Sequence, residues 1–294
     1  MSEPPDPINI NDVLFAFPRA FSLDLKILRA YYGVHSLEIR HDSSSPFYLP
    51  TPEGGSKSLF VPSDSGISLL TVLNKSYEFE KVMFFMELAG RVAGEVTLID
   101  IGANVGLFSR QCLNRIGNAR FVHCYEPHPD NFELLARNLG GIERVSLVNK
   151  GLGAEESRLA FYEDPQNVGN YSLNVHAMPE RFGRTEIDIL PAHSQEEAWL
   201  SPGLPILYKS DTQGFDEIIA TSLGDRVWQQ VEGGSFELWR LADKQFDRER
   251  FARILDVFPN KRFEKNRQQP VSTAEVMEFL SHEDNVADDL LFWK

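Results

Sequence analysis

The chain has 294 residues, of which 42% are hydrophobic, enough to bury the core of one large α/β domain with appendages. Its net charge of −14 opposes close approach to a phosphate backbone, and no cluster of Lys and Arg offsets that charge, so we expect no nucleic-acid substrate. The sequence has neither an apolar run of about eighteen residues nor a basic and apolar leader, and its two cysteines, Cys112 and Cys124, suit packing. We therefore expect a cytoplasmic protein without a membrane span.

Residues 1–75 are interpreted as an N-terminal extension. Residues 1–9 are polar and Pro-rich, which favours disorder, and residues 13–32 show an apolar spacing typical of a helix. The stretches SLEIRHD, PFYLP and SLFVP then indicate short strands. Such an extension could shape a substrate entrance or join two copies into a homodimer, but the interpretation we favour is that it covers a sheet edge.

Residues 76–294 form the predicted main domain, which opens with a helix at 77–92. The stretch EVTLIDIGANVGLFS, residues 95–109, then organises the rest of the chain. Its β-branched run predicts a buried parallel strand, and the turn that follows leads into a helix at 107–116. Glycine tolerates positive φ and close approach of a ligand, and Asn is the next most tolerant residue. Gly102, Asn104 and Gly106 therefore predict a tight turn that presents backbone N–H groups.

The spacing of this turn is D-x-G-x-N-x-G, not the G-x-G-x-x-G that binds dinucleotides. Asp100 at the strand end would repel a diphosphate, whereas it suits a cation such as the amino group of a methionine moiety. Glu126 ends a second predicted strand, ARFVHCYE, twenty residues after Gly106, and an acid there can accept both ribose hydroxyls of an adenosine. The acid, the glycine turn and the second acid together predict S-adenosylmethionine as the cofactor.

The next segments predict a helix, a strand and an irregular insertion. In HPDNFELLARNLG we expect Asp130 as N-cap and Gly140 as the C′ residue, while Asn131 could touch the ribose or cap the helix. A third strand at 145–149 and a hairpin arm, RLAFYED, come next. Residues 164–204 show little periodicity, which predicts an acceptor-binding insertion that acts as a mobile lid. Its candidate substrate ligands are His176, Arg181, Arg184 and His193.

Residues 205–223, PILYKSDTQGFDEIIATSL, predict a fourth parallel strand beside the first, then a turn and a helix. Lys209 and Asp211 would then project into the crevice that holds the cofactor. Asp211 is the candidate catalytic base for an acceptor hydroxyl, and Lys209 could stabilise the developing oxyanion or hold Asp211 ionised. Alternatively, Asp211 is the N-cap of a helix that begins near Gln213.

The last part of the chain completes the predicted sheet. SFELWRL is a fifth strand that contains Glu237, KQFDRERFARILDVF is an amphipathic helix, and ADDLLFW is the last strand, pairing at the edge. Asp211, Asp216 and Glu237 offer enough oxygen atoms for a divalent metal, but strand-end spacing alone is weak support, and we predict no metal site.

Three stretches, LIDIGANVG, YEPHPDNFELLARNL and KSDTQGFD, resemble the FkbM-type methyltransferases over roughly residues 77–225. The resemblance implies the class I methyltransferase Rossmann-like fold, an α/β fold with a seven-stranded, mostly parallel sheet and helices on both faces. It also implies S-adenosylmethionine-dependent O-methylation of a sugar hydroxyl in a polysaccharide, glycolipid or glycosylated natural product. A non-sugar hydroxyl and a cofactor-binding protein without catalysis remain as alternatives.

The same resemblance implies that Tyr77 and Glu78 lie near the cofactor and that Asn149 and Gly151 edge the adenine. One departure is visible, since family members usually have K-x-D-x-E-G-x-E, whereas Gln213 and Asp216 stand at the two glutamate positions here. Gln213 is therefore a candidate acceptor ligand. The complete set of expected cofactor contacts is Tyr77, Glu78, Asp100, Gly102, Asn104, Gly106, Glu126, Pro127, Asn131, Asn149, Gly151 and Asp211.

Two rival classes fit the sequence less well. A nicotinamide-dependent short-chain dehydrogenase needs a Tyr-x-x-x-Lys pair, and the one such spacing in this chain, Tyr77 and Lys81, precedes the predicted cofactor-binding turn. A methyltransferase acting on nucleic-acid bases needs an Asn/Asp-Pro-Pro-aromatic turn after the fourth strand, where this chain has SDTQ.

Overall fold

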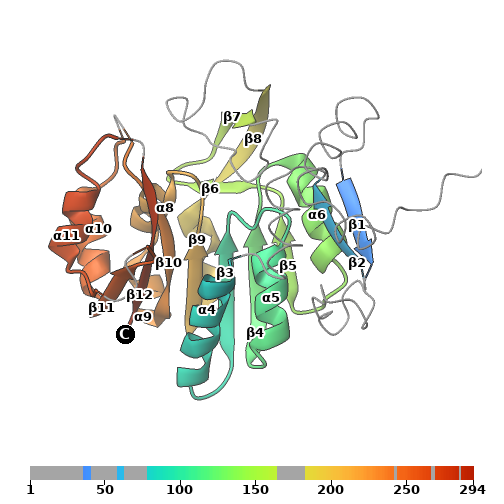
Figure 1. Cartoon of the computed structure of the whole chain (residues 1–294), viewed down its shortest axis with the longest axis horizontal. Coiled ribbons are helices and arrows are strands. Elements are labelled where there is room, and N and C mark those ends of the chain that lie inside the picture. Colours follow the sequence, from blue (N-terminus) through green and yellow to red (C-terminus); the bar gives the residue numbers. More distant parts are fainter. Residues whose placement is uncertain are drawn as a thin grey trace, which may run out of the picture.

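The computed structural model describes residues 36–40, 58–62, 78–163, 183–241, 244–265, 269–284 and 286–294. Its centre is a seven-stranded sheet with the strand order β11-β12-β10-β9-β3-β4-β5 (Figure 1). The strands are β3 (Val96–Ile101), β4 (Ala119–Tyr125), β5 (Val145–Val148), β9 (Ile206–Ser210), β10 (Val231–Trp239), β11 (Asn260–Phe263) and β12 (Ala287–Trp293). Only β12 runs against the others, because it is antiparallel to both β10 and β11.

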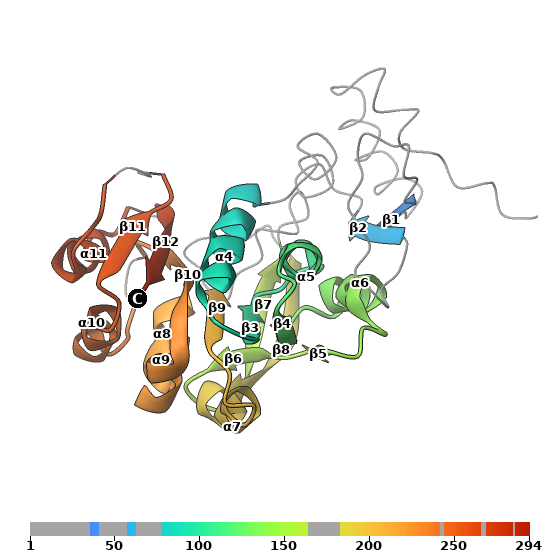
Figure 2. The same ribbon diagram turned by 90° about the horizontal axis from the view of Figure 1, so that it is seen from below.

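Helices cover both faces of this sheet. One face carries α4 (Phe79–Arg91), α5 (Leu107–Arg115) and α6 (Pro129–Leu139), and the other carries α7 (Glu196–Leu200), α8 (Asp216–Ser222), α9 (Asp225–Gln230), α10 (Arg248–Asp256) and α11 (Thr273–Phe279). Figure 2 shows α4 and α5 on one side of the strands and α8 and α9 on the other. A parallel strand covered on both faces is apolar throughout, which is why all six residues of β3 are buried.

The sheet is doubly wound. The chain starts in the middle at β3, adds β4 and β5 on one side, and then returns to place β9 on the other side of β3. The carboxyl ends of β3 and β9 therefore flank the switch point, which is the usual ligand position in open α/β sheets. The predicted α/β architecture, with seven mostly parallel strands and two helical layers, is confirmed.

The expected edge position of the last strand is wrong. Strand β12 lies between β10 and β11, and β11 is the edge strand. The sequence of β11 is NKRF, whose two cations and four-residue length give no alternating apolar signal.

The N-terminal strands β1 (Ser36–Arg40) and β2 (Ser58–Pro62) form an antiparallel pair, as SLEIR and SLFVP predict. The pair packs on α6, where Asn138 exchanges two hydrogen bonds of 2.6 and 2.7 Å with the backbone of Phe60. Within the described residues the edge strand β5 pairs with β4 alone, so this hairpin covers a helix and not the sheet edge. The expected helix at 13–32 and the strand PFYLP lie outside the described residues.

Two helix-terminus predictions are corrected. Helix α6 begins at Pro129, with His128 as the N-cap residue and no capping bond from its side chain, so Asp130 lies in the first turn and is not the N-cap. Proline suits that first position because its missing N–H has no partner there anyway. At the other end Gly140 is the C-cap with φ −61°, and the left-handed glycine is Gly141 at φ +88°.

The second half of the expected irregular insertion is regular. Strand β8 (Gly183–Pro191) is antiparallel to β7 (Ser157–Glu163) and parallel to β6 (Gly151–Gly153), and a short 3₁₀ helix, η2 (Ala192–Gln195), and α7 follow. The signal was present in TEIDI, where Ile187 and Ile189 are buried and the alternating residues Glu186 and Asp188 are exposed. Residues 164–182 lie outside the described part of the chain.

Candidate functional site

The carboxyl ends of β3 and β9 bring together the residues that sequence reasoning placed at the switch point. Asp100 and Lys209 are direct neighbours in the pairing of the two strands, and Lys209 Nζ lies 3.1 Å from Asp100 Oδ1. The hydroxyl of Ser109 donates to Asp100 Oδ2 at 2.6 Å. Asp100 is fully buried, so the cation that it binds in this structure is the ammonium group of Lys209.

Asp211 follows β9 and lies between two lysines. Its Oδ2 atom is 3.5 Å from Lys209 Nζ and 3.7 Å from the Nζ of Lys81, which comes from α4. Burial favours the neutral acid, but the two ammonium groups outweigh it and lower the pKa of Asp211 to about 2. The helix that follows starts at Asp216 with Phe215 as its cap, so the N-cap interpretation of Asp211 is wrong.

Three more carboxyl groups complete this cluster. Burial, and then the charge of Asp211, raises the pKa of Glu237 well above its usual range, and Glu237 hydrogen-bonds Asp211. Burial also raises the pKa of Glu78, and it raises that of Asp289 to about 6, in both cases against the attraction of Lys81. Lys81 Nζ lies 2.7 Å from Glu78 and 2.8 Å from Asp289.

The cluster is asymmetric in exposure. The side chains of Lys81 and Lys209 are 1% and 3% exposed, whereas Glu78, Asp211 and Asp289 are each about one-fifth exposed. The cations therefore lie behind the carboxylates, and the surface that a ligand meets is negative.

Backbone strain gathers at the same place. Three non-glycine residues of the described chain have positive φ, namely Glu78 at 50°, Asn104 at 51° and Gln213 at 54°. Each contacts the site: Glu78 binds Lys81, the Asn104 N–H donates to Glu126, and Gln213 Nε2 donates to Glu237. Such conformations are costly, and in folded proteins they concentrate at functional sites.

The glycines of the turn are required by packing within the chain. At Gly102, with φ +78°, a Cβ would lie 1.9 Å from the carbonyl oxygen of Asp211. At Gly106, with φ +83°, a Cβ would meet Leu135 at 2.7 Å. The turn is thus locked against β9 on one side and α6 on the other.

Glu126 ties the end of β4 to this turn. Its two carboxyl oxygens accept the backbone N–H groups of Asn104 at 2.9 Å and His128 at 2.8 Å. Burial raises its pKa to about 7, although both N–H bonds favour the charged form. Asn149 donates to the carbonyl oxygens of Glu126 and Pro127, so it braces the same corner.

The remaining predicted residues are dispersed. Asn131 is buried in the first turn of α6, and a Cβ at Gly151 would meet Ile189. His193 is exposed in η2, and Arg184 lies in β8. Tyr77, His176 and Arg181 fall outside the described residues. In the part of the chain that the structure describes, no three His, Cys, Asp or Glu residues form a metal-binding group, and no helix is long and apolar enough to cross a membrane.

Sequence reasoning missed Lys81 and Asp289. Lys81 lies on the buried face of α4 with Phe85 and Leu88, at positions i, i+4 and i+7. A lysine within an apolar helical stripe is a signal that could have been used, because a buried ammonium group needs counter-charges.

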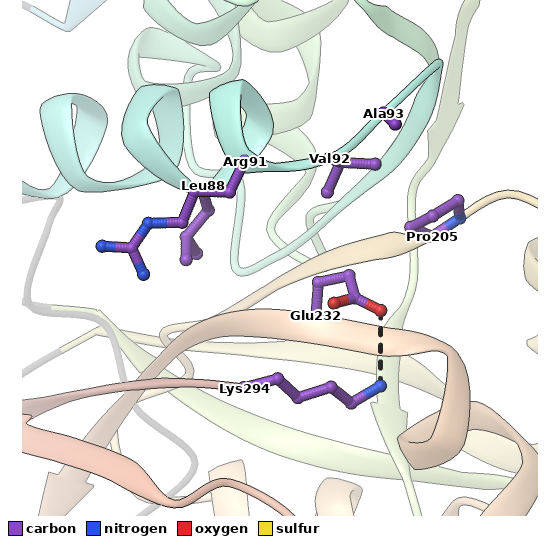
Figure 3. A pocket seen from close by; sticks show the side chains of 7 residues that line it. All are labelled: Leu88, Arg91, Val92, Ala93, Pro205, Glu232 and Lys294. Carbon is purple, nitrogen blue, oxygen red and sulfur yellow. Dashed lines mark hydrogen bonds and ion pairs between the residues drawn. The ribbon is translucent and has the colours of Figure 1, made fainter.

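A pocket of about 320 Å³ lies at the opposite end of the sheet (Figure 3). Pro205 and Glu232 line it at the amino ends of β9 and β10, and Lys294 bonds Glu232 across it at 3.4 Å. It takes in none of the residues of the charged cluster.

Comparison with known proteins finds only distant structural similarities. No family model matches the chain, and no curated protein matches it. Similar solved structures include a methyltransferase FkbM from Methylobacillus flagellatus KT, with 15% identity, coverage of 69% of this chain and 45% of that one, and a TM-score of 0.39. A putative rRNA-methylase from Clostridium thermocellum shares 10% identity over 73% and 97% of the two chains, with a TM-score of 0.36.

A SAM-dependent O-methyltransferase from Thermotoga maritima shares 14% identity over 74% of this chain and 65% of that one, with a TM-score of 0.31. The match spans less than half of the FkbM protein. Similarities this low identify neither a family nor an acceptor, so function has to be inferred from the site itself.

Proposed function

We propose that the protein is an S-adenosylmethionine-dependent methyltransferase that acts on a sugar hydroxyl. The observation that supports this most is the sign of the charge at the carboxyl ends of β3 and β9, where partly exposed carboxylates stand in front of buried lysines. Such a surface repels the diphosphate of a dinucleotide and attracts a ligand with sulfonium and amino groups.

The residues present fit this cofactor. Glu78 and Asp211 could receive its cationic part, and Glu126 on the neighbouring strand could accept ribose hydroxyls through the lone pairs that its two backbone bonds leave. Asp100 is buried behind Lys209, so its contribution would act through that lysine. The turn of Gly102, Asn104 and Gly106 would present its backbone beside the start of α5.

When bound, S-adenosylmethionine would supply a methyl group on a positively charged sulfur that leaves as a neutral thioether. The chain's first task is to hold the acceptor oxygen in line with that methyl group, and such positioning contributes roughly 7–11 kcal/mol. Asp211, with its pKa near 2, is a weak base. It would accept the hydrogen bond of the acceptor hydroxyl and take the proton late, when the new O–C bond has made that proton strongly acidic.

Residues 76–294 would supply this catalytic domain, with residues 164–204 forming the acceptor-binding insertion. Strand β8 gives that insertion a rigid base, since it pairs with both β7 and β6.

One feature favours a second candidate function, cofactor binding without catalysis. Gln213, at a position where the resembled family has glutamate, is already engaged, because it donates to Glu237 at 2.9 Å. The acceptor site would then have one carboxylate fewer than in that family.

Two measurements test these proposals. Calorimetric titration should show binding of S-adenosylmethionine and none of NAD⁺; the reverse result would remove the methyltransferase proposal. A panel of sugars and of non-sugar alcohols should then give S-adenosylhomocysteine release with at least one sugar. Binding without release from any acceptor would favour the non-catalytic function, and release from non-sugar alcohols alone would reassign the acceptor.

A further inference from the structure

The reversed strand β12 delivers a residue to the site. Because β12 is antiparallel, its first residues lie at the carboxyl ends of the parallel strands, in register with the end of β10. Asp289 stands directly opposite Glu237 in this pairing. Figure 2 shows β12 and β10 beside α4, from which Lys81 comes.

Two acidic residues directly opposite on neighbouring strands repel each other. Here Asp289 is hydrogen-bonded to Lys81 Nζ at 2.8 Å, and the same ammonium group binds Glu78. Lys81 is 1% exposed, so its charge depends on these carboxylates for stabilisation.

The contacts line up as a row of alternating charge, Asp100, Lys209, Asp211, Lys81 and Asp289. Neighbouring charged atoms along this charge row are 3.1, 3.5, 3.7 and 2.8 Å apart. Asp211 occupies the centre, and both lysines approach its Oδ2 atom. Each lysine also binds a second carboxylate, Asp100 on β3 for Lys209 and Asp289 on β12 for Lys81.

We propose that Lys81 and Asp289 are positioning residues for Asp211: Asp289 anchors the ammonium group of Lys81, and Lys81 fixes the orientation and the ionised state of the Asp211 carboxylate. The catalytic role of Asp211 rests on the proposed methyl transfer. The contacts in the charge row are present in the structure whatever the function is. Sequence reasoning assigned only the Lys209 half of this arrangement.

The charged groups around the row define what a titration would report. Asp211 faces Lys209 from β9, Lys81 from α4 and Glu237 from β10. Asp289 faces Lys81, Asp211 and, from the segment after β11, Glu264. Removing Lys81 takes away one of the two cations that oppose protonation of Asp211, so the pKa of Asp211 should rise.

The test is carbon-13 NMR of aspartate carboxyl groups in the full chain without ligand, with the Asp211 signal assigned from its absence in Asp211→Asn. In the wild type the midpoint of this signal should lie near pH 2, so the titration is followed from pH 7 down to about pH 1.5. In Lys81→Met its midpoint should move up by about one unit, a tenfold change in proton affinity, while Lys81→Arg restores the wild-type behaviour. An unmoved midpoint in Lys81→Met would overturn the proposal. Should that variant not fold, Lys81→Gln replaces it, because its amide still donates hydrogen bonds.

Asp289 is tested through turnover with its neighbour as control. Asp289→Asn should lower kcat at least tenfold with KM for S-adenosylmethionine unchanged, and should add nothing in the Lys81→Met background. Asp288→Asn, opposite Leu238 and bonded to the Lys265 N–H, should leave both the NMR titration and turnover unchanged. Full turnover in Asp289→Asn would overturn the role of Asp289. A wild type without turnover would instead contradict the proposed function, and the NMR titration would still decide the role of Lys81.

Discussion

Asp211 offers one carboxylate oxygen to two buried ammonium groups, so its charge has a structural as well as a chemical consequence. The Asp211→Asn variant keeps the shape but removes the counter-charge, and we expect it to lose about 1–3 kcal/mol of unfolding free energy. Urea denaturation measures this loss. Turnover should fall about 10²–10⁴-fold. A variant with wild-type stability would show that the charge row is not needed for folding, and near-normal turnover would remove Asp211 from the chemistry.

Gly102 has no room for a side chain, because a Cβ would collide with the main-chain oxygen of Asp211. Gly102→Ala should therefore destabilise the protein far more than Gly203→Ala. Gly203 also has positive φ, at +66°, but has open space where a Cβ would be, so its substitution should cost only the conformational penalty of about 1–2 kcal/mol. Comparing the melting temperatures of Gly102→Ala and Gly203→Ala separates the cost of the steric collision from the cost of the backbone conformation. Equal melting temperatures would mean that β9 can move away from the turn.

Glu126→Ala should weaken S-adenosylmethionine binding by about 1–3 kcal/mol, because a buried hydrogen-bonded carboxylate is lost and the Asn104 N–H is released with it. Glu133→Ala, on the exposed side of α6, is the matched control and should bind normally. Isothermal titration calorimetry gives both affinities, and unchanged binding in the Glu126 variant would exclude Glu126 from the cofactor site.

The sequence correctly predicted which residues lie close together wherever one rule applies, namely that the carboxyl ends of adjacent parallel strands meet. Asp100, Lys209 and Asp211 all come directly from that rule. Lys81 and Asp289 could not be found by that rule, because Lys81 lies on a helix and Asp289 lies on an antiparallel strand. The local sequence pattern of these two elements does not specify which of their residues meets the ends of the parallel strands.

Strand β8 is paired on both sides, with β7 and with β6. We expect slow hydrogen–deuterium exchange of its backbone amides in the free protein, slower than in the exposed turn at 154–156. Mass spectrometry of peptides covering 183–191 makes the comparison. Fast exchange there would restore the mobile-lid hypothesis for this part of the insertion.

Among the elements, long and apolar segments were predictable and short polar ones were not. Strand β3 and helix α4 agree with their predicted positions within two residues, since burial on one or two faces dictates their composition. Strand β11 was missed because its pairing with β12 is a tertiary contact that NKRF does not encode. The cap of α6 was misplaced because Asp and Pro both favour helix starts and Pro129 precedes Asp130.

The molecule as a whole should be most stable at mildly acidic pH. Burial raises the pKa of Glu126 and Glu217 from 4.5 to about 7 and that of Asp289 from 3.8 to about 6. These acids bind more protons folded than unfolded, so the stability they contribute is complete below the unfolded pKa values and is lost as pH rises towards 7. Asp211 acts oppositely, since its pKa is lowered to about 2, and its contribution is lost only below pH 4.

Thermal unfolding at constant ionic strength should therefore give a higher melting temperature at pH 5 than at pH 8, by roughly 2–4 °C for each kcal/mol. Glu217→Gln removes one of the titrating groups outside the site and should flatten the profile. A melting temperature that rises steadily from pH 5 to pH 8 would contradict the assigned pKa directions.

The position of β12 also dictates an order of assembly. Strands β10 and β11 are both made before β12, yet they cannot join the sheet as neighbours, because β12 lies between them. The bond between Lys81 and Asp289 spans 208 residues, so a growing chain would lack this partner of Lys81 until β12 is made. The complete sheet would then form late in synthesis, and a chain truncated before residue 287 should retain helices α4 to α6 but lack the β12 end of the charge row.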